Sequence, residues 1–160
     1  MRDVLSAPAV LVDEKARAID AVMQMRTHNV AGLPVINARG KVVGVLSQKD
    51  IARVVVGTSR FPTVEGLLDV LLDGLADRPG ASLQRQRTVL EHTPVGEIMS
   101  RPAIVIRSDA SLALAARVMR DRVVNRLPVV DDGRLVGVVA RSDVLQGLAP
   151  SARLERVRRR

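Results

Sequence analysis

Two aspartates lie at equivalent points of a sequence that repeats itself, and each has polar neighbours that could take part in binding. Asp50 follows Ser47 and Lys49, and Asp143 follows Ser142. Each aspartate precedes a short apolar run that predicts a helix, so its carboxylate should lie beside the N–H groups of a helix start. A carboxylate only accepts hydrogen bonds and can bind both hydroxyls of a ribose, while helix N–H groups bind anions. The same carboxylate could instead serve only to stabilise the helix start.

Arginines near these helix starts could bind phosphate. Arg126 precedes the second LPV segment, where Gly32 stands in the first. A guanidinium fork suits phosphate oxygens, and Arg122, one helical turn earlier, could assist. The alternative is that Arg126 only packs its stem along the surface. Because the first copy lacks such a cation, and Ala140 replaces Ser47 in the second, we expect one good nucleotide site and one weak or vacant one.

The chain is an internal duplication. Val4–Asn37 aligns with Ile98–Asp131, and Gly40–Ile51 aligns with Gly133–Val144; sixteen of the aligned positions are identical. Repeated units are usually supersecondary modules that cannot bury their apolar face alone and must stack on a copy.

Each copy predicts the order βαββα. Short strands at residues 9–12 and 103–106 precede helices, with Ser111 or Asp109 as a helix cap in the second copy. Two apolar strands then surround a tight turn, which contains Asp132 and Gly133 in the second copy and favours a two-residue hairpin. Val10 and Ile104, at the predicted strand starts, could line a ligand cleft or belong to the core.

The apolar hairpins predict an α+β fold in which two βαββα units pack sheet to sheet with pseudo-twofold symmetry. The expected divisions are residues 2–56, a helical linker at 57–93, residues 94–149 and a basic tail at 150–160. Thr63 could cap an amphipathic linker helix reaching Asp77, and residues 82–92 could form another helix or be loose.

The composition argues against two classes of protein, single-strand nucleic-acid binders and membrane-spanning proteins. The formal net charge is +8, cysteine is absent, and Phe61 is the only aromatic residue, which argues against base-stacking single-strand binders. No apolar run is long enough to span a membrane, and the absence of cysteine fits a cytosolic setting, so we expect a cytoplasmic protein. The arginine-rich tail is either solvated or contacts an anionic partner such as nucleic acid.

The repeated motifs resemble one known family. The order L-S-x-P or M-S-x-P, then LPV, then G-x-(V/L)-VGV, then a terminal aspartate occurs twice, and it is similar to the CBS domain in a tandem pair. The resemblance implies paired βαββα units that dimerise and bind AMP, ADP, ATP or S-adenosylmethionine in the cleft between the domains. It also implies that the aspartate holds the ribose, and that the module regulates an associated enzyme or transporter.

We therefore expect a regulatory, energy-sensing homodimer without catalytic residues, metal or required cofactor. Candidate ligand contacts are Asp50, Ser47, Lys49, Asp143, Ser142, Arg126, Arg122, Val10 and Ile104. The alternatives are a nucleic-acid or anionic-surface binder acting through the basic tail, and a ligand-free dimerisation scaffold. An enzyme is not expected, because neither a phosphate loop nor a histidine beside a nucleophile is found.

Overall fold

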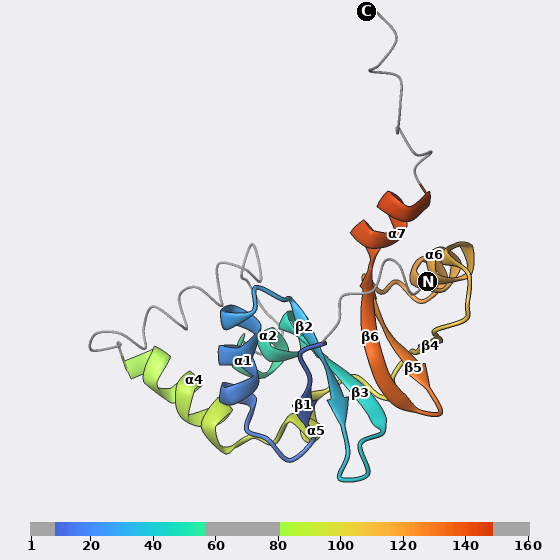
Figure 1. Ribbon diagram of the computed structural model, residues 1–160. Helices are drawn as coiled ribbons and strands as arrows, with labels where there is room; N and C mark the ends of the chain where they lie inside the picture. Colours follow the sequence, from blue (N-terminus) through green and yellow to red (C-terminus); the bar gives the residue numbers. More distant parts are fainter. Residues whose placement is uncertain (1–8, 57–80, 149–160) are drawn as a thin grey trace, which may run out of the picture. The chain divides into compact units, whose positions relative to one another are not determined.

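The structure, a computed structural model, describes residues 9–56 and 81–148 of the chain (Figure 1). The described residues form two compact units, an N-terminal unit at Val10–Ile104 and a C-terminal unit that starts at Val105. Each contains one three-stranded sheet and its helices, as the predicted α+β class requires. The predicted helix at residues 63–77 and the basic tail lie outside the described residues.

The two units have the predicted βαββα order. The N-terminal unit contains β1 (Val12–Asp13), α1 (Ala18–Thr27), β2 (Gly32–Ile36), β3 (Val42–Ser47) and α2 (Gln48–Val56), followed by α4 (Ala81–His92) and α5 (Val95–Ile98). The C-terminal unit contains β4 (Ile106–Arg107), α6 (Leu112–Asp121), β5 (Arg126–Asp131), β6 (Arg134–Ala140) and α7 (Arg141–Leu148).

The two sheets share one topology and one register. In each, a short first strand runs parallel to the middle strand, which pairs antiparallel with the third. Val35 lies opposite Gly44, and the aligned Val129 lies opposite Gly137. Both ladders shift register directly after that valine. Since register decides which side chains face the core, the sequence duplication is also a structural one.

The first strand of each copy is shorter and later than predicted. We expected strands at 9–12 and 103–106, but β1 and β4 contain two residues each and begin at Val12 and Ile106. The carbonyl of Ile36 accepts a bond from the Glu14 N–H at 2.9 Å, so by the two-residue alternation of a strand the Pro34 backbone also faces β1. Proline has no N–H to donate, which ends the parallel ladder, and Pro128 holds the same position in the second copy.

The predicted turn and cap of the second copy are confirmed. Asp131 pairs with Arg134, and the two residues between them, Asp132 and Gly133, have φ angles of 50° and 78°. Two positive φ angles are typical of the tight hairpin turn that follows the right-handed twist of the strands. Ser111 caps α6 by accepting a hydrogen bond from the Leu114 N–H at 3.1 Å.

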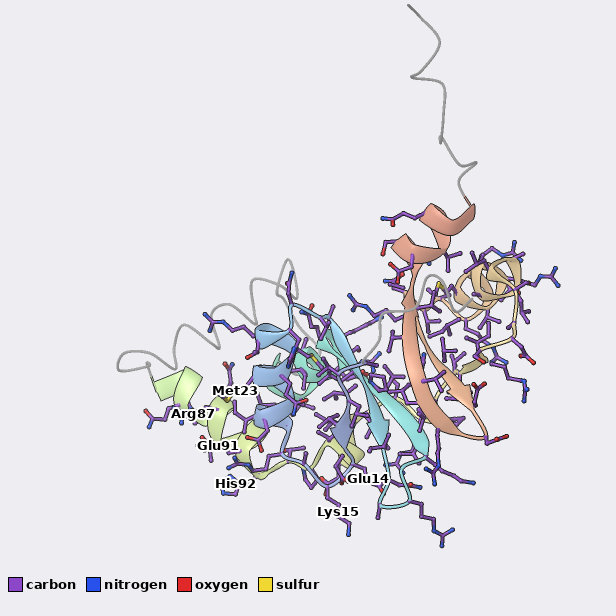
Figure 2. All side chains as sticks on the ribbon, in the orientation of Figure 1. Glu14, Lys15, Met23, Arg87, Glu91 and His92 are labelled. Atoms are coloured by element: carbon purple, nitrogen blue, oxygen red, sulfur yellow. The ribbon has the colours of Figure 1, made fainter. Side chains whose placement is uncertain are left out.

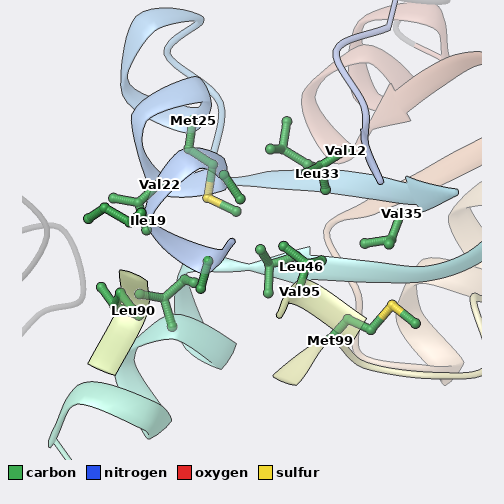
Figure 3. Packing of buried hydrophobic residues seen from close by; sticks show 13 residues of the cluster. Val12, Ile19, Val22, Met25, Leu33, Val35, Leu46, Leu90, Val95 and Met99 are labelled. Atoms are coloured by element: carbon green, nitrogen blue, oxygen red, sulfur yellow. The ribbon is translucent and has the colours of Figure 1, made fainter. Parts of the chain in front are cut away.

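The core of the N-terminal unit lies between the sheet and its helices. Val22 and Met25 of α1 pack with Leu33 and Leu46 of the hairpin, as Figure 3 shows. Residues 82–92, which the sequence left open, belong to α4, and this helix packs against α1 and α2 (Figure 1) with Leu90 fully buried.

The exposed side chains described on α4 are polar apart from Val89, in keeping with a helix that covers the core from one side only. Arg87 and Glu91, one turn apart on this helix, form an ion pair at 2.7 Å (Figure 2). This exposed pair adds only a few tenths of a kcal/mol, so it is mainly the apolar contacts that hold α4 in place.

The start of the second sequence copy packs on the N-terminal unit. Residues 93–101, here called the connector, contain α5 and end in an isolated antiparallel bridge between Ser100 and Val45. Both backbone bonds of that bridge measure 3.0 Å. A Cβ added at Gly44 would overlap the Met99 sulfur and lie 3.0 Å from the Ser100 carbonyl oxygen, so a side chain at this position would force Met99 and the bridge to shift.

We therefore predict that Gly44→Ala destabilises the protein by about 1–3 kcal/mol, because the added methyl overlaps the connector. The free energy of unfolding in urea measures the loss. Met99→Ala removes the flexible part of the overlap, so Gly44→Ala should cost less in that background. Equal cost in both backgrounds would show that Met99 does not contribute to the overlap.

Candidate functional site

The end of β3 and the start of α2 are joined through Asp50. Its Oδ2 accepts hydrogen bonds from the Ser47 N–H at 2.9 Å and from the Ser47 hydroxyl at 2.5 Å. The Asp50 N–H lies 3.3 Å from the same hydroxyl oxygen. This reciprocal pairing of a serine with an acidic residue three positions later is a capping box, which satisfies N–H groups that a helix start leaves without partners.

The second oxygen of Asp50 is also occupied. Its Oδ1 accepts from the Ser100 hydroxyl at 3.0 Å and from the Arg53 guanidinium at 3.2 Å. Asp50 is 4% exposed, whereas the Arg53 side chain is 65% exposed. The buried negative charge therefore has hydrogen-bond donors on both oxygens and one cation nearby, which offsets the cost of removing it from water.

Asp143 holds the same place in the second copy with fewer partners. Its Oδ2 accepts from the Ala140 N–H at 2.8 Å, and its Oδ1 lies 3.2 Å from the Ser142 hydroxyl. Ala140 has no hydroxyl to complete a capping box, and the position of Arg53 is taken by Gln146. Asp143 is half-buried, so its carboxylate keeps acceptor capacity that Asp50 has used.

Two arginines lie on backbone segments that meet at the start of α7. Arg126 is directly opposite Ala140 in the β5–β6 ladder, and the Arg141 N–H donates to the Asn125 carbonyl at 2.8 Å. Arg122 follows the last turn of α6. Among the described residues, these three guanidiniums have no carboxylate partner.

Two other arginines of the C-terminal unit are paired with carboxylates. Arg107 bonds to Asp109 at 3.1 Å, a hydrogen bond that raises the pKa of the guanidinium, and Arg120 bonds to Asp121 at 2.9 Å. Since these pairs occupy their guanidiniums, the cations available to an anion on this unit include Arg122, Arg126 and Arg141.

The remaining predicted site residues are Lys49, Val10 and Ile104, and they make no hydrogen bond to either aspartate among the described residues. Lys49 is exposed on the first turn of α2, next to Asp50 in sequence. Val10 packs against the core of the N-terminal unit, and Ile104 is the last residue of that unit. Val10 and Ile104 precede β1 and β4, so the prediction that they lie at the strand starts was wrong. That they line a ligand cleft stays a prediction.

Three further residues lie at the two strand–helix junctions, β3–α2 and β6–α7, and were not predicted as site residues. Arg53 lies three residues after Asp50, a helical spacing that could have indicated the pair. Arg141 takes the place of Gln48, a difference between the copies that is visible in the sequence. Ser100 is 50 residues from Asp50, and only the fold brings them together.

Two general features of the described residues bear on the class of site. Residues 9–56 and 81–148 contain no group of three or more histidine, cysteine or acidic side chains arranged to hold a metal ion. In the same ranges, none of the helices has the length and apolarity needed to cross a membrane.

Comparison with known proteins agrees with the repeated motif. The model of the CBS domain matches residues 1–57 and 95–150, which together are most of the chain. The chain belongs to the CBS domain family. The uncharacterized protein MJ1426 from Methanocaldococcus jannaschii is 30% identical, and the match covers 92% of this chain and 90% of that relative. The chloroplastic CBS protein CBSX2 of Arabidopsis thaliana is also 30% identical, but the match covers 53% of its length.

Solved CBS-domain structures have the same fold. The CBS domain of a membrane protein from Sphaerobacter thermophilus superposes with a TM-score of 0.72 at 26% identity, over 91% of this chain and 85% of that one. CBSX2, solved in complex with AMP, gives a TM-score of 0.66 at 26% identity, over 91% and 92% of the two chains. The CBS domain pair of protein MJ0100, solved with methylthioadenosine and S-adenosylmethionine, gives a TM-score of 0.63 at 25% identity, over 91% of each chain.

We predict that Ala140→Ser stabilises the protein by about 1 kcal/mol, because its hydroxyl can accept from the Asp143 N–H as Ser47 does for Asp50. The midpoint of urea unfolding measures the gain.

Ser47→Ala is the matched control for the first copy and should destabilise by about 1–2 kcal/mol, since it removes a cap and one donor to a buried carboxylate. If Ala140→Ser left the midpoint unchanged while Ser47→Ala lowered it, the two junctions would not be equivalent.

Proposed function

We propose that this CBS-domain chain is a regulatory module that binds an adenosine-containing ligand at its strand–helix junctions and transmits binding to a partner enzyme or transporter. The observation that supports this proposal most strongly is the half-buried carboxylate of Asp143 at the start of α7. Arg126 and Arg141 lie on backbone segments that meet at the same helix start, and neither has a carboxylate partner among the described residues. Such a junction offers acceptors for a ribose and cations for a phosphate within one unit.

In the second copy, each residue has a distinct role. Asp143 accepts hydrogen bonds from the two ribose hydroxyls, while the N–H groups of α7 and the Ser142 hydroxyl face the anionic part of the ligand. Arg126 binds phosphate oxygens with its guanidinium fork, and Arg122 assists it. Arg141 joins them because its backbone is bonded beside Arg126, at Asn125.

In the first copy, Asp50 is the corresponding ribose acceptor, and Ser47 and Lys49 are the donors for an anion. Lys49 is exposed and can approach a phosphate, but Ser47 is already bonded to Asp50. Gly32 supplies no cation opposite this helix start. The second copy is therefore the stronger site, and Val10 and Ile104 are proposed only as apolar contacts to the base.

Relatives support the class of ligand. CBSX2 has been solved with AMP, and MJ0100 with methylthioadenosine and S-adenosylmethionine, so CBS pairs of this fold bind adenosine derivatives. No other cofactor is required by the proposal. Homodimerisation and energy sensing remain predictions from the family resemblance, and a cytoplasmic location remains a prediction from composition.

We predict that the full chain binds AMP, ADP, ATP or S-adenosylmethionine saturably in calorimetric titration. Arg126→Ala should weaken the binding of the phosphate-bearing ligands about tenfold, since it removes a charge-assisted hydrogen bond. Asp143→Asn should weaken all of them, because the amide has one acceptor oxygen in place of two.

Arg134→Ala is the control for charge. Arg134 lies on the same hairpin as Arg126 but at the opposite end, where it pairs with Asp131, and its removal should leave binding unchanged. If Arg134→Ala weakened binding as much as Arg126→Ala does, the effect of Arg126 would be explained by the net charge of the protein and not by a direct contact with phosphate. The absence of heat with all four ligands would exclude the proposed function.

A further inference from the structure

One hydrogen bond connects the first ligand-site carboxylate to the start of the second sequence copy. The Ser100 hydroxyl donates to Asp50 Oδ1 at 3.0 Å, and the Ser100 backbone exchanges two bonds with Val45. Through these contacts the connector is fixed both to β3 and to the first turn of α2. A change at the Asp50 carboxylate therefore reaches the connector directly.

The carboxylate has no acceptor position left for a ribose. It receives four donor contacts, two on each oxygen, and a carboxylate has about four lone-pair positions. Because Asp50 is 4% exposed, a ligand hydroxyl can bond to it only if one of these donors withdraws.

The four donors differ in what their release would cost. The two contacts from Ser47 belong to the capping box of α2, and losing them would open the helix start. The two contacts on Oδ1 come from outside the box. Arg53 is largely exposed and can bond to water after release. The backbone of Ser100 is joined to β3 by one isolated bridge, while residues 93–96 of the connector are bonded separately to residues 14–18. Oδ1 is therefore the oxygen that a ribose can reach.

We propose that the Ser100–Asp50 hydrogen bond is an autoinhibitory contact: a ribose that bonds to Asp50 through both of its hydroxyls needs two acceptor positions, so it must displace the Ser100 hydroxyl as well as Arg53. The release of Ser100 loosens the connector from β3. This inference rests on the proposed function, since it names the regulation of the same site. Ligand binding at Asp50 is thereby coupled to the position of the segment that leads into the second copy.

The second copy lacks this inhibition within the residues that the structure describes. Asp143 has two donors, the Ala140 N–H and the Ser142 hydroxyl, and the latter comes from the neighbouring, exposed residue. A ribose can approach Asp143 without releasing a distant segment of the described chain.

The test uses the full chain with AMP as the probe. Asp143→Asn weakens the second site so that the first can be observed by calorimetry. In that background, Ser100→Ala should tighten AMP binding about tenfold, because the competing donor is removed from Asp50. Ser100→Thr keeps the hydroxyl and should leave the affinity near that of Asp143→Asn alone, which controls for substitution in the connector.

Hydrogen exchange followed by mass spectrometry provides a second measurement. In the ligand-free protein, Ser100→Ala should speed exchange in a peptide covering residues 97–101 roughly tenfold, since the side-chain bond no longer supports the bridge. Ser142→Ala removes the hydroxyl that bonds to Asp143 Oδ1 in the second copy and should leave exchange in this peptide unchanged. Saturating AMP should speed exchange there in the wild type and no further in Ser100→Ala.

The outcomes separate the two proposals. If the wild type binds AMP but Ser100→Ala does not tighten binding in the Asp143→Asn background, the autoinhibitory contact is wrong and the proposed function stands. Unchanged exchange at residues 97–101 in Ser100→Ala would also overturn it. If the wild type binds none of the adenosine ligands, the proposed function falls, and the exchange rates of the ligand-free variants still decide whether Ser100 holds the connector.

Discussion

The hydrogen bond from the end of the hairpin to an aspartate three residues later is the constraint on which both sequence copies depend. The Ser47 N–H bonds to Asp50 at 2.9 Å, and the Ala140 N–H bonds to Asp143 at 2.8 Å. This bond turns the chain from strand into helix without an intervening loop, and it directs the carboxylate back toward the strand end. The first N–H of each helix is also bonded to the residue preceding the middle strand, at 3.1 Å in the first copy and 2.8 Å in the second. The residue before each LPV segment is therefore held near the same helix start as the aspartate.

The two copies keep this frame and differ in the charges placed around it. In the first, the cation close to the carboxylate is Arg53, which belongs to the same helix and pairs with Asp50 directly. In the second, Gln146 stands in its place, and the cations are Arg126 on the strand and Arg141 on the first turn of the helix. One copy thus neutralises its own carboxylate, while the other leaves cations for an external anion. A duplication that preserved only the fold would not require this redistribution, and it agrees with the proposal that the second copy is the stronger site.

The sequence predicted those features that depend on short-range patterns. The order of strands and helices follows from the apolar runs and from the glycine and proline residues between them. Asp132 and Gly133 predicted the turn, and Ser111 predicted the helix cap. The lengths of β1 and β4 could not be obtained in this way, because they depend on which side of the middle strand Pro34 and Pro128 direct their missing N–H. That side is known only once the strands are paired.

The candidate site shows the same division between local and distant information. Both aspartates were found from their position at a predicted helix start, since a capping box spans four residues. Ser100 could not be assigned to Asp50, because 50 residues separate them and the serine also fits a repeated motif of its own copy. The sheet-to-sheet packing of the copies stays a prediction from their apolar hairpins, and the predicted helix at 63–77 lies outside the described residues.

The energy of one hydrogen bond is enough to give the two copies different responses. A bond to a charged group contributes about 1.5–3 kcal/mol, which corresponds to roughly a ten- to hundredfold difference in affinity. If Ser100 must be displaced from Asp50, the second copy fills at low ligand concentration and the first only at a concentration higher by that factor. Coupling of this kind is reciprocal, so a partner that pulls residues 93–101 away from β3 would raise the ligand affinity of the first copy by the same factor. The difference between the copies would then serve regulation. The second copy would bind ligand at low concentration, and binding at the first copy would be coupled to movement of the connector.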